Sequence, residues 1–450
     1  MALRVKISRR AMLTTAGAGA VLGGGWLGAD AIRRDRIEAG VLPWLKANAH
    51  PFDISRPDSI WSPALSRALA GARIIGLGEA THGSHEDAAV KAAIIKGLVS
   101  DGAIKALLLE VNAPGGRELD AFIRGGADDP FERLRTAKVF RVVKTRALGD
   151  LLGWLRAWNQ TAASPVRLFG IDCQASAEDA ATALEALRAT DRAAADGLAA
   201  RLRPIVSEEA RKLRFPALIK SLTTAQLLEA MTALEDLEEA LARSGGGRDA
   251  LYAARTAWQG LKAFELETSD GKIAGDVAAY YSRRDGFMAD NVLNSPTDGA
   301  AALWAHNYHV AGGQAAGMTP TGGQLRRALG DAYRSVVVEY GAARFNAVPA
   351  APFGPYPDAS EPTEVIHWKG LGGRLASIMD KVGGEAFWVS LRDLPKDDAG
   401  TSWRSLPYRL DWPGYAATPW QALSFPVSTP VHSLFDLVVF LGSMTPSRPV

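Results

Sequence analysis

Short, continuously apolar runs that end in a polar residue recur along the chain and constrain its fold most strongly. The first three are ARIIGLGE (72–79), IKALLLEVN (104–112) and PVRLFGID (165–172). A helix is predicted between the first two runs, because Ser84 can cap its start, with Asp87 three residues on, and Gly102 follows its end. Strands that are apolar on both faces and alternate with helices form parallel sheets covered on both sides. The sequence therefore predicts an α/β protein with a mostly parallel central sheet flanked by helices.

The middle of the chain has a different composition. Residues 175–298 are mostly Ala, Leu, Glu, Arg and Lys with helical periodicity, which predicts a large all-helical insertion. Strand-like runs return at 299–310, 333–342, 385–391 and 435–442. We expect residues 32–72 to form an N-terminal helical segment, and residues 73–450 to form the main domain that carries the insertion.

Residues 1–31 resemble an export signal. The stretch SRRAML (8–13) looks like a twin-arginine signal, and residues 29–31 fit an A-x-A cleavage site. The alternative is a membrane anchor, but the many glycines and alanines between residues 11 and 29 make a poor one. We therefore expect a periplasmic or secreted protein, exported by the twin-arginine route, with no stable membrane insertion after cleavage.

Composition and the absence of familiar motifs exclude several classes of protein. A formal net charge of +2 over 450 residues gives no reason to expect nucleic acid as a partner, and the single Cys173 can build neither an intrachain disulfide nor a thiolate metal site. There is no G-x-S-x-G elbow, no Walker A sequence and no H-E-x-x-H motif, and Thr81 stands where a dinucleotide-binding loop would have its third glycine. Histidine and carboxylate chemistry remains.

Four acid or imidazole side chains come at the ends of separate strand-like runs, namely Glu79, Glu110, Asp172 and His306. The carboxyl ends of parallel strands meet at one edge of a sheet, where ligands bind. We therefore expect these residues to share one active site. His82 follows in a glycine-flanked turn, where Glu79 or Glu110 could fix its tautomer and let it take a proton from water. Such a general base is worth about 10²–10⁴ in rate.

Two further segments offer groups for the same site. In WAHNYH (304–309), His306 and His309 with Asn307 could donate hydrogen bonds to a developing oxyanion. The helical stretch YYSRRDGFMADN (280–291) offers Arg284 for a substrate oxygen or for stabilising negative charge, although it also fits an ordinary salt bridge on an amphipathic helix. Asn307 and Asp172 are the predicted substrate-binding residues.

A metal site built from the same residues is an alternative. Histidine and carboxylate side chains are ligands for zinc, iron and manganese, and the ligands here would be His82, His85 and His309. His85 stands at the predicted start of a helix, where we expect it to face solvent. The prediction that we favour has no cofactor.

Five segments, in this order, resemble the erythromycin esterase family: GEATHGSHE (78–86), LLLEVN (107–112), FGID (169–172), RRDGFMADN (283–291) and WAHNYHV (304–310). The resemblance runs from about residue 73 to residue 450, which it identifies as an erythromycin esterase-like catalytic domain. It implies hydrolysis of a macrolide lactone or another ester by water, with a possible role in the response to antibiotics.

The resemblance also implies roles for individual residues. His82 corresponds to the family's general base, Glu79 and Glu110 to its two glutamates, and Arg284, His306 and His309 to its remaining site residues. Well-studied members work without a required metal, whereas remote relatives bind haem or metal.

The chain departs from the family pattern in two ways. His85 stands where the family usually has another residue, and an export signal is unexpected for relatives that inactivate macrolides in the cytosol. We predict an exported monomeric hydrolase that cleaves a small-molecule carboxylic ester or macrolide-type lactone without a covalent intermediate. The alternatives are a metal-dependent hydrolase on the same residues and a non-enzymatic haem- or metal-binding exported protein.

Overall fold

The computed structural model describes residues 31–450 except 214, 265–276, 316, 350–362, 368–373, 411, 415 and 418–426. The predicted export signal therefore lies outside the described residues, apart from Ala31. The described N-terminal part begins with a helix over residues 31–48, followed by the short strand β1 (His50–Pro51), the 3-10 helix η1 (Pro57–Ile60) and helix α2 (Pro63–Leu69).

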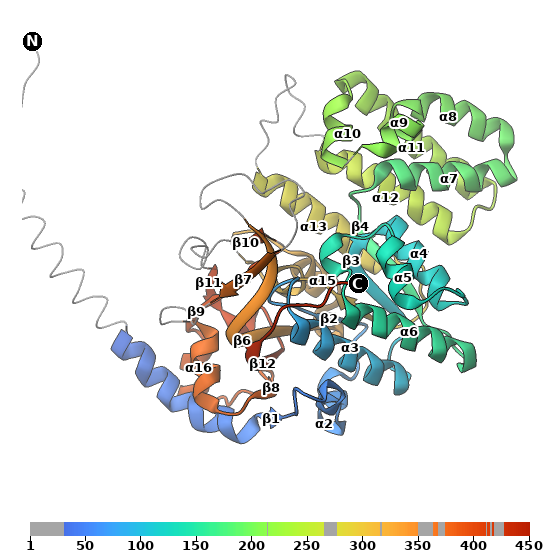
Figure 1. The fold of residues 1–450 in the computed structure, drawn as a ribbon. Coiled ribbons are helices and arrows are strands. Elements are labelled where there is room, and N and C mark those ends of the chain that lie inside the picture. Colours follow the sequence, from blue (N-terminus) through green and yellow to red (C-terminus); the bar gives the residue numbers. More distant parts are fainter. Residues whose placement is uncertain are drawn as a thin grey trace, which may run out of the picture.

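A sheet with ten strands within the described residues forms the centre of the molecule (Figure 1). Its main path runs β1-β8-β12-β6-β2-β5-β3-β4, and β7 and β10 also pair with β6. The bounds are β2 Ile74–Leu77, β3 Ala106–Asn112, β4 Arg167–Asp172, β5 Ala301–Trp304, β6 Tyr333–Pro349, β7 Thr363–His367, β8 Ala386–Ser390, β10 Ala416–Ala417 and β12 Leu437–Met444. From β12 to β4 all neighbours are parallel, whereas β8 and β1 at one edge, and β7, are antiparallel. The predicted fold class is confirmed.

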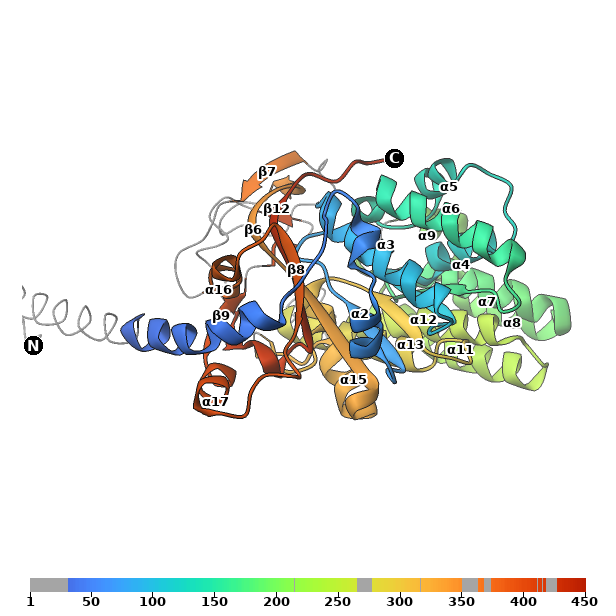
Figure 2. The same cartoon turned by 90° about the horizontal axis from the view of Figure 1, so that it is seen from below.

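Helices cover both faces of this sheet, which explains why its strands are apolar throughout (Figure 2). The remaining bounds outside the helical region are α3 His85–Ser100, α4 Ala113–Ile123, α5 Pro130–Thr136, η2 Arg141–Val143, α6 Arg146–Thr161, α14 Asn307–Val310, α15 Thr321–Leu329, η5 Gly330–Ala332, α16 Leu375–Val382, α17 Asp398–Arg404 and η6 Val431–Ser433. Strands β9 (Pro407–Leu410) and β11 (Val427–Pro430) form a second, two-stranded sheet.

Two separate apolar clusters lie on the two faces of the sheet. The first contains Ile75 and Leu107 from the strands together with Leu98 of α3. The second contains their strand neighbours Ile74 and Leu108. Helices α14, α15 and α16 also contribute to this second cluster. Residues that alternate along a strand therefore belong to opposite faces, and a side chain's position in a strand decides which set of helices it meets.

Helices fill the region between β4 and β5. Their bounds are α7 Ser176–Thr190, α8 Arg192–Val206, α9 Glu208–Lys212, α10 Phe215–Ser221, α11 Thr224–Arg243, α12 Arg248–Phe264 and α13 Val277–Leu293. Helices α7, α8, α10, α11 and α12 bury a third apolar cluster of their own. Helix α13 instead returns to the sheet, where Met288 and Val292 join the second cluster. None of the described helices is long and apolar enough to cross a membrane.

The local structure agrees with the sequence prediction at the start of α3 and differs from it at the end of β5 and in the length of β6. The Ser84 side chain accepts a hydrogen bond from the Asp87 backbone N–H at 3.3 Å, as predicted for the start of α3. The run 299–310 is a strand only to Trp304, because residues 307–310 form the short helix α14. Strand β6 is longer than predicted, since β7 and β10 pair with its second half.

The turn that follows β2 is held tightly against two distant segments. The Gly83 carbonyl accepts hydrogen bonds from the backbone N–H groups of Asn346 (3.1 Å) and Ser447 (2.7 Å). A Cβ atom at Gly83 would lie 1.8 Å from the Asn346 carbonyl oxygen. Only glycine therefore fits here, and the close approach fixes the residues on either side of it, His82 included.

We predict that Gly83→Ala destabilises the fold by about 1–3 kcal/mol, because the added methyl group must displace the β6 backbone. Gly197→Ala is the matched control, since a Cβ there meets nothing within 4 Å inside α8. It should stabilise the protein by roughly 0.5–1 kcal/mol. Urea unfolding of both variants measures the two changes, and equal stabilities would contradict the close contact.

Candidate active site

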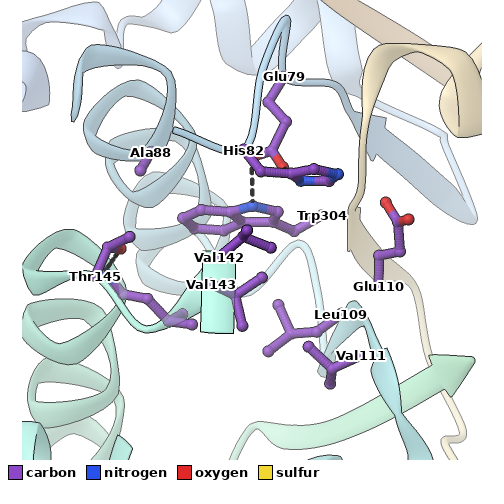
Figure 3. A pocket seen from close by; sticks show the side chains of 11 residues that line it. Glu79, His82, Ala88, Leu109, Glu110, Val111, Val142, Val143, Thr145 and Trp304 are labelled. Carbon is purple, nitrogen blue, oxygen red and sulfur yellow. Dashed lines mark hydrogen bonds and ion pairs between the residues drawn. The ribbon is translucent and has the colours of Figure 1, made fainter. Parts of the chain in front are cut away.

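Glu79 and His82 follow β2 at the carboxyl edge of the sheet, and their side chains are joined. His82 Nδ1 contacts Glu79 Oε1, while Glu79 Oε2 contacts Lys91 Nζ and accepts a hydrogen bond from Trp304 Nε1 at 3.0 Å. Glu79 is 5% exposed. Both carboxylate oxygens are thus occupied, and the orientation of Glu79 is fixed (Figure 3).

Charge pairing determines the ionisation of this group of residues. Burial raises the pKa of Glu79, but Lys91 and His82 outweigh it and lower that pKa to about 2. Burial lowers the pKa of His82, but the Glu79 carboxylate outweighs it, so the His82 pKa lies above its ordinary value. A neutral His82 donates its Nδ1 proton to Glu79 and keeps a lone pair on Nε2. This is the tautomer that a general base needs.

The sequence prediction missed Lys91. Its side chain is 1% exposed, and Nζ lies 4.0 Å from the centre of the Trp304 ring, in a cation–π contact. Burial lowers the pKa of Lys91, while Glu79 and Asp87 oppose this. The sequence signal for a buried Lys91 was its spacing. Lys91 is four residues after Asp87, one turn further along α3, on a face that is otherwise apolar.

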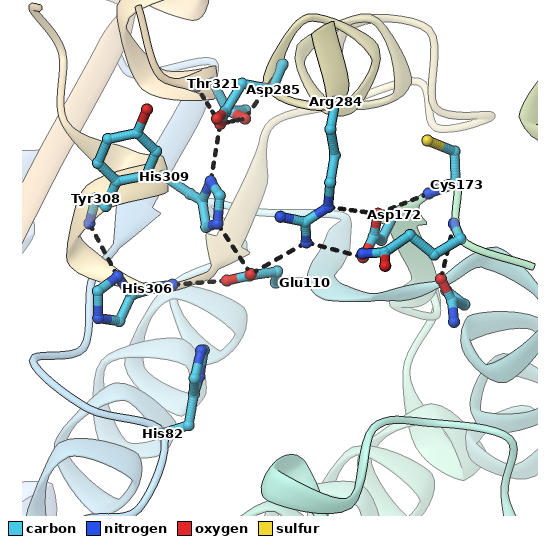
Figure 4. A network of polar contacts seen from close by, with 12 residues as sticks. His82, Glu110, Asp172, Cys173, Arg284, Asp285, His306, Tyr308, His309 and Thr321 are labelled. Atoms are coloured by element: carbon cyan, nitrogen blue, oxygen red, sulfur yellow. Dashed lines mark hydrogen bonds and ion pairs between the residues drawn. The ribbon is translucent and has the colours of Figure 1, made fainter. Parts of the chain in front are cut away.

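Glu110 of β3 is held by a second group of residues (Figure 4). Its Oε2 accepts the His306 backbone N–H at 2.9 Å, and its Oε1 lies 3.1 Å from His309 Nε2 and 3.5 Å from an Arg284 nitrogen. Burial raises the pKa of Glu110, but His309, His82 and Arg284 outweigh it and hold that pKa well below its usual range. Glu110 is therefore an ionised carboxylate.

His309 lies between two carboxylates. Its Nδ1 lies 2.8 Å from Asp285 Oδ1 and its Nε2 lies 3.1 Å from Glu110 Oε1. Burial lowers the pKa of His309, but Glu110 and Asp285 outweigh it and raise that pKa to about 10. His309 is an imidazolium with both N–H groups engaged. In this structure it holds Glu110, and its predicted role as a donor to an oxyanion stays a prediction.

Arg284 and Asp172 form a buried ion pair beside Glu110. Arg284 Nε donates to Asp172 Oδ1 at 3.0 Å, and a terminal nitrogen of Arg284 donates to Oδ2 at 2.9 Å. The Asp172 oxygens also accept from the Cys173 backbone N–H and the Gln174 side chain, and Asp172 is fully buried. These contacts give Asp172 and Arg284 structural roles beside Glu110, and their predicted roles in substrate binding and oxyanion stabilisation stay predictions.

Asn307 is likewise a structural residue. Its side-chain N–H donates to the Val338 carbonyl at 2.8 Å, and its side-chain oxygen accepts the Val338 N–H at 3.2 Å. It is fully buried against β6. Its amide joins α14 to the sheet, and its predicted role in substrate binding stays a prediction.

His306 keeps an unused donor near His82. Its Nδ1 accepts the Tyr308 backbone N–H at 3.3 Å, so the proton of a neutral ring is on Nε2. Burial, with His82 adding to it, lowers the pKa of His306 to about 3, so the ring is neutral. Nε2 is buried and has no hydrogen-bond partner among the described residues, and the ring centre lies 5.3 Å from that of His82. The His306 Nε2–H group is therefore available to a substrate.

A small cavity adjoins these groups. Its volume is about 20 Å³, and Glu79, His82 and Glu110 line it together with Trp304 and hydrophobic side chains. A cavity needs roughly 10–15 Å³, measured in this way, to hold one water molecule. The arrangement can therefore place one water beside a histidine base, with a neutral N–H donor on a neighbouring ring.

The alternative metal site is not assembled in the described residues. No group of three or more His, Cys, Asp or Glu side chains among them is arranged to hold a metal ion. His85 begins α3, and its backbone N–H donates to the Thr445 carbonyl at 2.9 Å. The set His82, His85 and His309 is therefore not a ligand set in this structure.

Comparisons with known proteins place this site in a family. The sequence model for erythromycin esterase matches residues 103–443, which include Glu110, Arg284, His306 and His309. A Bacillus cereus protein of known structure is similar with a TM-score of 0.74 at 22% identity, over 92% of this chain and 99% of its own. A succinoglycan biosynthesis protein is similar with a TM-score of 0.76 at 17% identity, over 91% of this chain and 98% of its own. A histidine-to-asparagine mutant of erythromycin esterase EreC in its open conformation is similar with a TM-score of 0.60 at 19% identity, over 85% of this chain and 93% of its own. At these identities the structural likeness shows the fold.

The raised pKa of His309 predicts how stability depends on pH. In the unfolded chain His309 titrates near 6.5 and in the folded chain near 10. Its ion pairs therefore stabilise the fold fully below pH 6.5, and this contribution is lost as pH rises towards 10. The free energy of unfolding of wild type, relative to His309→Gln, should fall by a few kcal/mol over this range, at about 1.4 kcal/mol per pKa unit. Urea unfolding at pH 6.5, 8 and 10 measures it, and a pH-independent difference would contradict the assignment.

Proposed function

The chain belongs to the erythromycin esterase family and is a hydrolase, and we propose that it cleaves a carboxylic ester or macrolide-type lactone with a water molecule activated by His82. One observation carries the proposal. Lys91, Glu79 and His82 form a connected row of side chains that ends at a water-sized cavity. A base held in one tautomer beside room for one water supports attack by that water on an ester carbonyl.

In the proposed reaction, His82 Nε2 takes a proton from water as the water oxygen attacks the carbonyl carbon. The imidazolium that forms is stabilised by the ionised Glu79 carboxylate. The carbonyl oxygen becomes an oxyanion, which accepts a hydrogen bond from the free His306 Nε2–H, a contact worth about 10²–10³ in rate for one donor. His82 then returns the proton to the leaving alcohol, and the acid and alcohol depart.

Two nucleophiles near the site are poorly placed for a covalent route. The Thr145 hydroxyl lines the cavity but accepts the Leu148 backbone N–H as the cap of α6. Burial raises the pKa of the Cys173 thiol, and its side chain is buried next to Asp172, so it is not activated. This supports direct attack by water without a covalent intermediate.

We predict that His82→Asn lowers kcat/KM about 10²–10⁴-fold in a panel of carboxylic esters and lactones that includes macrolides. Initial rates with the folded variant measure this, and undiminished hydrolysis would contradict the base assignment.

Loss of wild-type activity on chelation would favour a metal-dependent hydrolase, and a Soret band or bound metal without turnover would favour the non-enzymatic alternative. Turnover of a macrolide would extend the proposal to a response to antibiotics.

The pH profile gives the same experiment a second measurement. Since His82 must be neutral and its pKa lies above 6.5, wild-type kcat/KM should rise with pH through a pKa above that value. The double variant Glu79→Gln/Lys91→Met removes both charges of the buried pair and leaves no lone buried lysine. Its acid limb should move to lower pH, because the carboxylate that raises the His82 pKa is gone.

We further propose that the chain is exported by the twin-arginine route, on the basis of residues 8–13 and 29–31. Arg9→Lys/Arg10→Lys should leave the protein in the cytoplasm, whereas Arg33→Lys/Arg34→Lys, with the same chemical change outside the signal, should not. Cell fractionation with mass measurement of the N-terminus tests this. Equal distribution of the two variants would contradict the proposal.

A further inference from the structure

A strongly basic segment lies between α5 and α6. From residue 133 to residue 149 the chain has no acidic residue and six basic ones: Arg133, Arg135, Lys138, Arg141, Lys144 and Arg146. The whole chain of 450 residues has a formal net charge of only +2. The charge of this segment is therefore a local concentration and not a reflection of composition.

The same segment forms one wall of the catalytic cavity. Val142, Val143 and Thr145 line the cavity that His82 and Glu110 also line (Figure 3). Consecutive Cα atoms are about 3.8 Å apart. The basic residues Arg141 and Lys144 are adjacent in sequence to these lining residues, so their side chains start next to the cavity wall.

The first two cations, Arg133 and Arg135, are engaged by acids. Arg133 pairs with Asp128, and Arg135 pairs with Glu132. Lys138 is exposed and makes no ion pair within the described residues. The Lys144 ammonium donates to the Arg135 carbonyl at 2.7 Å, and exposed Arg146 lies 5.2 Å from the centre of the Phe131 ring.

The C-terminal segment adds a further cation. The Arg146 backbone N–H donates to the Arg448 carbonyl at 2.8 Å, which brings exposed Arg448 beside the start of α6. We call Lys138, Lys144, Arg146 and Arg448 the basic strip. Burial lowers the pKa of Lys144, Arg135 and Arg141 lower it further, and Glu118 opposes them. The strip thus holds like charges close together, an arrangement that a bound anion stabilises.

We propose, building on the esterase function proposed above, that the substrate is an anionic ester. The ester carbonyl lies beside the cavity at His82, and a carboxylate or another oxyanionic group of the same molecule contacts the basic strip. Each exposed ion pair is worth about 1.4- to 5-fold in binding, and several cations acting together about tenfold or more. The strip would disfavour an ester that carries a cationic amine in the same place.

Three 4-nitrophenyl esters with acyl chains of equal length test this: the hexanoate is neutral, the adipate monoester is anionic, and the 6-(trimethylammonio)hexanoate is cationic. With the full chain, kcat/KM should follow the order anionic, neutral, cationic. The triple variant Lys138→Gln/Arg146→Gln/Arg448→Gln should lower the anionic-to-neutral ratio about tenfold. Raising the salt concentration from 0.15 to 1 M shortens the Debye length from about 8 to 3 Å and should lower the wild-type ratio in the same direction.

The matched control is Lys212→Gln/Arg243→Gln, whose side chains are exposed on the helical region. It also removes positive charge but should leave the ratio unchanged. Equal rates for the three esters, or equal effects of the two sets of substitutions, would overturn the inference. If no ester is turned over, binding of the corresponding 4-nitroanilides is measured instead. Tighter binding of the adipate amide by wild type than by the triple variant would sustain the anion site although the esterase proposal fails. Equal binding by the two proteins would overturn both the anion site and the esterase proposal.

Discussion

The site depends on one buried carboxylate, Glu79, which is shared between Lys91 and His82. An ionised carboxylate removed from water costs several kcal/mol unless its charge and lone pairs are matched. Here Lys91 supplies the charge, and His82 and Trp304 occupy the oxygens that remain. The consequence for chemistry is direct, because the same pairing that makes burial of Glu79 tolerable also fixes the tautomer of His82 and raises its pKa. Stability and base strength therefore have a common origin.

Three histidines in this small volume are set to three different states. His82 is a strengthened base beside Glu79, His309 is a permanent imidazolium between Glu110 and Asp285, and His306 is a neutral ring. His306 differs because its polar neighbour on Nδ1 is a backbone N–H instead of a carboxylate, and because two other histidines lie close to it. Such separation of titrating groups by environment distinguishes a base from a hydrogen-bond donor of the same residue type.

The sequence predicted where functional side chains gather better than it predicted what they do. The strand ends at Glu79, Glu110 and His306 were found from apolar runs, since the position of a residue after a buried strand is a property of the local sequence. The contacts of Asp172, Asn307 and His309 could not be found from local sequence. They depend on partners more than 20 residues away in the chain, which occupy the donors and acceptors of these side chains. Lys91 was missed for a similar reason: a lysine on a helix is normally exposed, and only the distant Trp304 and the Glu79 carboxylate make burial possible.

The alternation of a β-strand explains how two groups of charged side chains reach one cavity from opposite faces of the sheet. Lys91 of α3 contacts Glu79 from one face of the sheet, and the Trp304 side chain of β5, which also contacts Glu79, packs in the apolar cluster on that face. Arg284 and His309, which contact Glu110, come from α13 and α14 on the opposite face. Each carboxylate therefore has its own nearest cations, but His82, which pairs with Glu79, also lowers the pKa of Glu110. At the carboxyl edge, where the strands end, both carboxylates line one cavity, and the ring centres of His82 and His306 lie 5.3 Å apart. The edge of a parallel sheet thus brings a base and a neutral donor together beside one cavity.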